Sequence, residues 1–110
     1  MPTHQELDAR SLALHRLIAE RIRQQPALFE QVGRALTRRS GIVSPDARPH
    51  VLEWERAFCQ GMDAALALAT EESERAAALR QSSPFAGVLS PQERWAFLKA
   101  WKRRGAERSA

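Results

Sequence analysis

Apolar residues recur at steps of three and four along the first quarter of the chain, with charged residues between them. One such stripe consists of Leu14, Leu17, Ile18 and Ile22. This spacing is typical of an amphipathic α-helix. It predicts a helix over residues 8–24, with Asp8 as the N-cap. The helix ends before Pro26, because proline is not tolerated in a helix interior.

The same spacing continues after this proline. The apolar residues at helical steps are Leu28, Phe29, Val32, Ala35 and Leu36. They predict a second helix over 27–39, with Pro26 in its first turn, where proline is common. The segment 40–49 is rich in glycine, serine and proline, which indicates a loop.

A longer apolar face follows this loop. Its members are Val51, Trp54, Phe58, Ala65, Leu66 and Ala69. It predicts a third helix over 49–70, in which Gly61 is a weak point because glycine costs about 1 kcal/mol relative to alanine. Three acids beginning at Glu71 fit the first turn of another helix, where negative charge is favoured. We therefore expect a short fourth helix over 71–81; a single helix over 49–81 is the alternative.

The most specific local signal is the tetrapeptide Ser-Pro-Gln-Glu at residues 90–93. It matches a capping box with proline at the first helical position. An apolar stripe of Trp95, Leu98 and Trp101 follows it. These features predict a fifth helix over 91–104.

The chain as a whole is expected to be all-α. No alternating pattern typical of strands appears, and 110 residues suit a single domain. The expected fold is a small bundle of about five helices that occupies residues 1–110. Short loose ends are expected at 1–7 and 105–110.

The net charge is +4, but the charged residues are unevenly distributed along the chain. Residues 53–74 carry six acids against one arginine, whereas residues 91–110 carry six lysines and arginines against two acids. The acidic segment is therefore a candidate to face a basic site on a partner protein. The basic end is a candidate to bind a polyanion.

Several classes of function lack support in the sequence. The three histidines lie far apart, and His15 beside the first apolar stripe is expected to be an ordinary, partly buried residue. The single cysteine has no partner for a metal site or an intramolecular disulfide. No glycine-rich nucleotide motif and no nucleophile motif occurs. We expect no enzymatic activity, no metal and no cofactor.

The cellular location is expected to be the cytoplasm. A single cysteine without a signal peptide favours a reducing compartment. No apolar run approaches the roughly 20 residues that a membrane span requires. We expect no association with a membrane.

The loop before the last helix carries three apolar residues, Phe85, Val88 and Leu89. In one interpretation they fold back and fill the space between the last two helices. In the other they stay exposed and dock into a partner protein, with Trp95 and Trp101 as aromatic anchors of the kind found at interface hot spots. These five residues are the candidate partner-binding set.

The last helix also carries a basic cluster, which consists of Lys99, Lys102, Arg103 and Arg104. Basic residues beside an aromatic ring can contact phosphates and stack a base. A regulator that binds nucleic acid through this helix is therefore the alternative function. A third possibility is self-assembly, for example as a homodimer.

Two segments resemble small uncharacterised bacterial proteins whose genes lie beside toxins of toxin–antitoxin pairs. They are LDARSLALHRLIAERIR, residues 7–23, and LRQSSPFAGVLSPQERW, residues 79–95, and together they cover 34 of the 110 residues. The resemblance implies a neutralising partner of a toxin. We therefore expect a non-catalytic protein-binding module, antitoxin-like or regulatory, whose partner is a toxin-like protein or a regulated enzyme.

Overall fold

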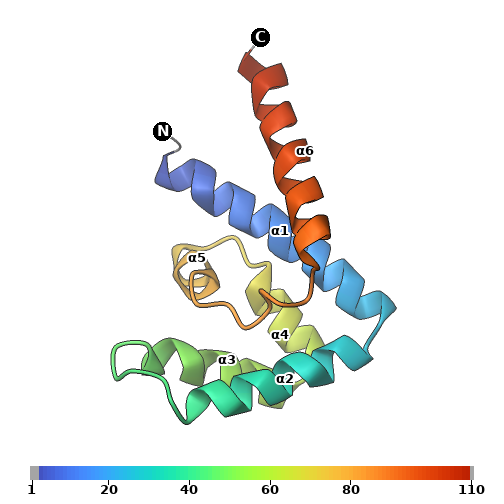
Figure 1. Cartoon of the computed structure of the whole chain (residues 1–110). Helices are drawn as coiled ribbons and strands as arrows, with labels where there is room; N and C mark the ends of the chain where they lie inside the picture. The colour runs from blue at the N-terminus through green and yellow to red at the C-terminus, as the bar shows by residue number, and fades with distance from the viewer. Residues whose placement is uncertain (1–2, 110) are drawn as a thin grey trace.

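The computed structural model describes residues 3–109, and the side chains of residues 3–106. Within this range all regular structure is helical, as expected, and no strand occurs. Six helices are present where about five were expected (Figure 1). They are α1 (His4–Gln24), α2 (Ala27–Ser40), α3 (Arg48–Gln60), α4 (Met62–Ala69), α5 (Glu74–Arg80) and α6 (Pro91–Ser109).

Helix α1 begins four residues before its expected start, because its N-cap is Thr3 and not Asp8. The Thr3 hydroxyl accepts the Glu6 amide at 3.1 Å, and the Glu6 carboxylate accepts the Thr3 amide at 2.9 Å. This capping box satisfies two amide groups that a helix start otherwise leaves open. Most of the expected loose end at 1–7 is therefore helical, while residues 1 and 2 lie outside the described residues.

The expected third helix is two helices, α3 and α4, which meet at Gly61. The backbone of Gly61 has φ 119°, a conformation that a residue with a Cβ rarely adopts. Glycine here ends α3 and does not merely weaken a continuous helix. Helix α4 then ends at Thr70, where a break was expected, so the single helix over 49–81 is wrong.

Helix α5 begins at Glu74 and not at 71, because Ser73 is its N-cap. The Ser73 hydroxyl accepts the amide of Ala76 at 3.1 Å. Glu71 and Glu72 consequently precede the helix. The expectation that these acids form the first turn rested on their charge alone. It did not take into account that Ser73 can act as an N-cap.

The core lies where α1, α3, α4 and α5 meet. Its largest fully buried side chains are Trp54, Phe85, Ile22, Leu66 and Val51. The Trp54 indole N–H donates to the carbonyl oxygen of Leu79 at 3.1 Å, which satisfies the one polar atom of the ring. Helix α2 covers α3 through Phe29 and Phe58, whose rings stack with centroids 4.7 Å apart.

Helix α6 begins as expected. The Ser90 hydroxyl accepts the Glu93 amide at 3.1 Å, and Glu93 accepts the Ser90 amide at 3.0 Å, which confirms the capping box. The helix does not end at residue 104 but continues to Ser109. Gly105 keeps a negative φ, since glycine only weakens a helix unless it takes up a left-handed conformation. Of the loose end expected at 105–110, residue 110 lies outside the described residues.

Candidate functional site

The loop between α5 and α6 fills the core. Phe85 has an exposed fraction of 0%, and Leu89 is also buried. The Phe85 ring lies 5.6 Å from the rings of both Trp54 and Phe58, measured between centroids. Val88 is half-buried against the same core. The docking interpretation of the loop is therefore wrong for Phe85 and Leu89, because the core of α3 supplies the apolar surface that they need.

Polar contacts hold this loop against α1. The expected burial of His15 is confirmed, and its imidazole nitrogens lie 2.7 Å from the Ser11 carbonyl oxygen and 2.8 Å from the Ser83 hydroxyl. The Ser83 hydroxyl also accepts the Phe85 amide at 3.1 Å. Burial lowers the pKa of His15, as does the charge of nearby Arg80. The neutral imidazole donates from Nδ1 and accepts at Nε2, and so links the loop to α1.

Helix α6 differs from the other helices because it buries none of its described side chains. Every residue from 91 to 106 is half-buried or exposed. Trp95 is 62% exposed, whereas Phe97, Leu98 and Trp101 are half-buried. In Figure 1, α6 crosses α1 and then extends away from the other helices. Large apolar side chains of α6 therefore remain at the surface.

One apolar face of α6 lies over a groove shared with α1. The groove has a volume of about 590 Å³. Its apolar lining residues are Ala13, Leu17, Ala96, Phe97, Ala100 and Trp101. The rings of Phe97 and Trp101 stack, with centroids 6.2 Å apart. The sequence analysis missed Phe97, although its place four residues before Trp101 on one helix face indicates such a pair.

A second depression lies beside Trp95 and has a volume of about 460 Å³. Leu89, Pro91 and Leu98 line it together with the tryptophan. Of the five candidate partner-binding residues, Trp95 and Trp101 are thus at the surface, on different sides of α6. Trp95 and Leu98 share one side with the end of the loop.

Contacts at its first turn attach α6 to the body. The Arg21 guanidinium of α1 donates to the Glu93 carboxylate, which forms an ion pair. This contact, together with the Ser90 amide, lowers the pKa of Glu93 to about 2. Arg94 donates to the Ala86 carbonyl oxygen of the loop.

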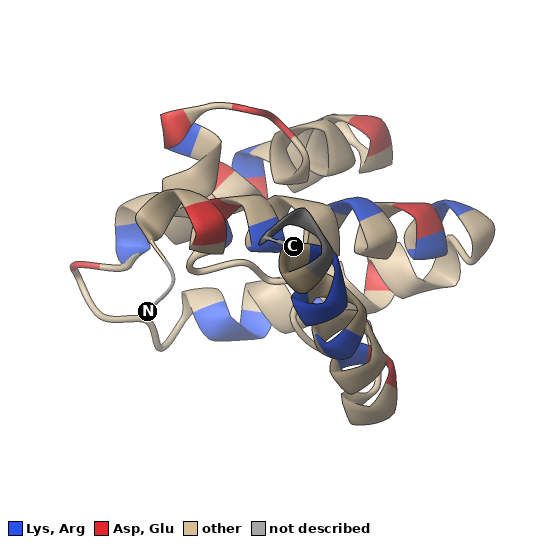
Figure 2. Ribbon diagram, turned by 90° about the horizontal axis from the view of Figure 1, so that it is seen from above, with Lys and Arg blue, Asp and Glu red and all other residues tan. Residues whose placement is uncertain are grey.

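The four basic candidates are all exposed, and they do not form one patch. A step of 100° per residue places Lys99, Lys102 and Arg103 on the side of α6 that carries Trp95. Lys99 Nζ lies 5.8 Å from the centroid of the Trp95 ring. Arg104 lines the groove between α1 and α6 on the other side. Figure 2 shows lysine and arginine along most of α6, with an acid near its start.

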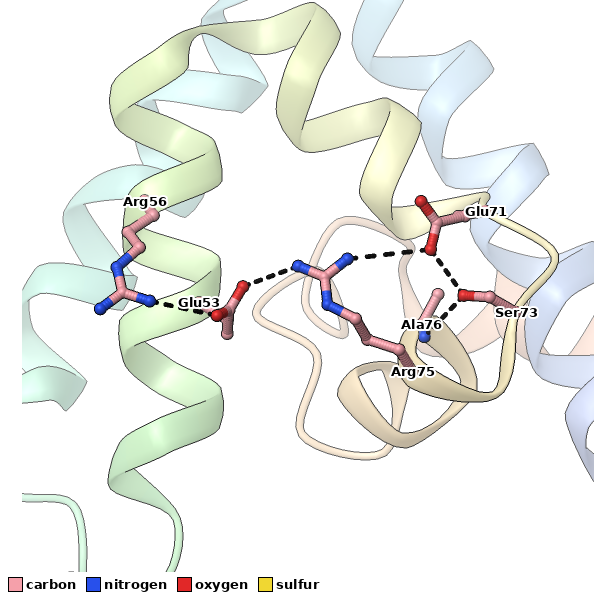
Figure 3. A network of polar contacts seen from close by, with 6 residues as sticks. All are labelled: Glu53, Arg56, Glu71, Ser73, Arg75 and Ala76. Carbon is pink, nitrogen blue, oxygen red and sulfur yellow. Dashed lines mark hydrogen bonds and ion pairs between the residues drawn. The ribbon is translucent and has the colours of Figure 1, made fainter.

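Three of the six acids in the acidic segment 53–74 form ion pairs within the described part of the chain. Glu53 contacts both Arg56 and Arg75, at 3.1 and 2.7 Å (Figure 3). The hydrogen bond from Arg75 lowers the pKa of Glu53. Glu71 lies 3.9 Å from the same arginine, and Glu72 pairs with Arg16 at 2.5 Å. These pairs leave less negative charge for a partner than the sequence indicates.

No group of three or more histidine, cysteine, aspartate or glutamate side chains in the described part of the chain is placed to hold a metal ion. Across the same residues, no helix combines the length and the apolar content that crossing a bilayer requires. Comparison of the chain with protein-family models, curated proteins and solved structures found no match.

Proposed function

We propose that the chain is a non-catalytic protein-binding module whose docking surface is α6 together with the face of α1 beside it. The observation that carries the proposal is the lack of any buried side chain between residues 91 and 106, in a helix that contains two tryptophans, a phenylalanine and a leucine. Most helices in proteins gain their stability by burying an apolar face. A partner that covers α6 would supply that burial.

The shape of the groove favours a helical partner. Three alanines, Ala13, Ala96 and Ala100, line the groove between α1 and α6 and leave room for another backbone to approach. Phe97 and Trp101 offer the aromatic surface found at hot spots. An amphipathic helix laid into an apolar groove is a common mode of peptide recognition.

Charge favours an acidic partner over a second copy of this chain. Lys99, Lys102 and Arg103 share a side of α6 with Trp95, and Arg104 borders the groove. The acids that line the groove are Glu20 of α1 and Glu93, which is already paired with Arg21. Two copies that met through α6 would bring basic helices together, which is unfavourable. The proposed partner therefore presents an apolar stripe flanked by aspartate or glutamate.

The resemblance of residues 7–23 and 79–95 gives this module a role. It supports a bacterial, cytoplasmic regulatory subunit of the antitoxin kind, which binds and neutralises a toxin-like protein or an enzyme. The docking surface overlaps both segments, since Leu17 and Trp95 belong to them.

The test is a titration of the captured partner. The tagged chain captures its partner from a bacterial lysate, and the purified partner is then titrated calorimetrically with the Trp95→Ala and Trp101→Ala variants. Each substitution is expected to weaken binding by about 2 kcal/mol or more. The control is Ile42→Ala, which removes a side chain that is 86% exposed in the loop before α3.

We expect Ile42→Ala to leave the affinity for the captured partner unchanged. Equal affinity of all three variants would show that the partner does not use α6. If the chain captures no other protein and associates with itself through Trp95, the occupant of the docking surface is a second copy of this chain and the proposed partner is wrong.

Nucleic acid is the second candidate, and one observation favours it. Lys99, Lys102 and Arg103 share a side of α6 with the exposed ring of Trp95, which places phosphate-binding groups beside a surface for stacking a base. Neutralising Lys99, Lys102 and Arg103 together would then weaken binding and reduce its salt dependence by roughly one unit of slope for each lost phosphate contact. The same change should mainly slow association with an acidic protein.

A further inference from the structure

A different cleft lies between the first half of α1, the loop after α5 and the first turns of α6. Its volume is about 330 Å³. Its charged lining residues are Arg10, Arg80 and Arg94, and the buried His15 also lines it. Among the described residues, no aspartate or glutamate lines this cleft. The charged side chains that line the cleft are therefore all basic, while the carboxylates of Asp8 and Glu71 lie near enough to act on the charge of Arg80.

Arg80 is the most unusual of these residues because it is a buried cation. Its exposed fraction is 6%. Its guanidinium donates to the carbonyl oxygens of Ala69 and Glu71, at 3.3 and 2.9 Å, and its Nε has no acceptor. Among the described residues, no carboxylate oxygen lies within 4.0 Å of it.

A buried charge of this kind normally has an ionic partner. One carbonyl group belongs to the last residue of α4 and the other lies two residues beyond it, and they offset part of the charge through the helix dipole. They do not supply a full negative charge. Burial accordingly lowers the pKa of Arg80.

The other two arginines border the cleft at its surface. Arg94 donates to the Ala86 carbonyl oxygen, which orients its side chain at the rim. Arg10 is exposed, and its guanidinium has no hydrogen bond or ion pair with any described residue. Guanidinium groups bind carboxylates through paired hydrogen bonds.

The rest of the cleft is apolar. Leu7, Leu14, Ile18, Phe97 and Leu98 line it. An inorganic anion would leave this surface uncovered, whereas an anion with a short hydrocarbon body would cover it. Ligand sites of this size commonly combine an apolar lining with a few charged groups that fix orientation.

We propose that this cleft binds a small organic carboxylate, with its charged head against the three arginines and its hydrocarbon body on the apolar lining residues. The cleft adjoins the proposed protein-docking groove, because Phe97 lines both of them, but its arginines Arg10, Arg80 and Arg94 do not line the groove. It does not depend on the proposed function.

The test uses octanoate as the probe and the full chain labelled for NMR. The ring signals of His15 report on the cleft directly, since this residue lines it. Octanoate is expected to shift these signals in a saturable manner. It should also raise the pKa of His15, because a nearby negative charge favours the imidazolium form. Octanol and inorganic phosphate are the matched probes, one without the charge and one without the hydrocarbon body.

Variants assign the binding to the arginines. Arg80→Met and Arg10→Met are each expected to weaken octanoate binding by about tenfold or more. Arg38→Met, at the exposed end of α2, is the charge-matched control and should leave octanoate binding unchanged. Arg10 lies at the surface, so its variant remains informative even if Arg80→Met does not fold.

Three results would overturn the inference. The absence of saturable shifts with octanoate would mean that Arg80 only caps α4. Equal binding of octanol would show that the charge is not recognised. Equal binding of phosphate would show that the apolar lining is not used.

Discussion

Arg21 of α1 donates a hydrogen bond to the same Glu93 carboxylate that accepts the Ser90 amide. One side chain thus both caps α6 and attaches it to α1. The rest of α6 buries no described side chain. The position of the helix therefore depends on contacts in its first turn together with the half-buried side chains of Phe97, Leu98 and Trp101.

Acid should release α6. The folded pKa of Glu93 is about 2, below its ordinary value of 4.5, so the contribution of this carboxylate is present above pH 4.5 and is lost as the pH falls toward 2. We expect the amides of α6 to lose protection across this window, measured as the exchange rate relative to the intrinsic rate at the same pH, ahead of those of α3. Glu93→Gln should give fast exchange already at pH 6. Protection of the α6 amides that stays constant from pH 6 to pH 2 would contradict this role.

The capping box can be tested by itself. Ser90→Ala removes the hydroxyl that accepts the Glu93 amide and is expected to lower stability by about 0.5–2 kcal/mol. Urea denaturation of the two proteins measures the difference. A neutral result would mean that the start of α6 does not depend on this cap.

Phe85 should behave as a core residue. Its ring is fully buried among Trp54, Phe58 and His15, so Phe85→Ala is expected to cost about 3–5 kcal/mol. That is a large share of the roughly 5–15 kcal/mol available to a domain, and thermal unfolding should begin far earlier. Trp95→Ala is the surface control and should leave the melting temperature nearly unchanged. A larger loss of stability in Trp95→Ala than in Phe85→Ala would contradict the burial of Phe85.

His15 should make stability depend on pH near neutrality. Burial lowers its folded pKa below the ordinary value of 6.5. The unfolded chain therefore binds the proton more readily, and stability falls as the pH drops below 6.5. Urea midpoints at pH 8 and pH 5 measure this loss. In His15→Gln the difference between the two urea midpoints should become smaller. An unchanged difference would mean that other titrating groups cause the pH dependence of stability.

Local signals in the sequence predicted much of the fold. Pro26 and the tetrapeptide at 90–93 act on neighbouring backbone groups, so their effects can be read from a few residues. Thr3 and Glu6 also form a capping box. The expected N-cap was Asp8 instead, because the apolar stripe begins only after it. The turn at Gly61 could not be located, since glycine either remains in a helix or leaves it according to the packing around it.

The candidate site was predictable only in part. Phe85 and Trp95 are both aromatic residues near a helix start, yet one is buried and the other is 62% exposed. The difference arises because Phe85 meets Trp54, which lies in a distant part of the sequence. The cleft around Arg80 was not predictable for the same reason, since its arginines come from α1, α5 and α6.

The central claim is that α6 is the docking surface, and hydrogen exchange of the captured complex tests it most directly. Exchange rates are compared for each amide in the chain alone and bound to its partner. We expect the amides of residues 95–106 to slow by about tenfold or more, equivalent to about 1.4 kcal/mol, while those of α2 keep their rates. Protection confined to α2 and α3, with α6 exchanging as in the unbound chain, would contradict the claim.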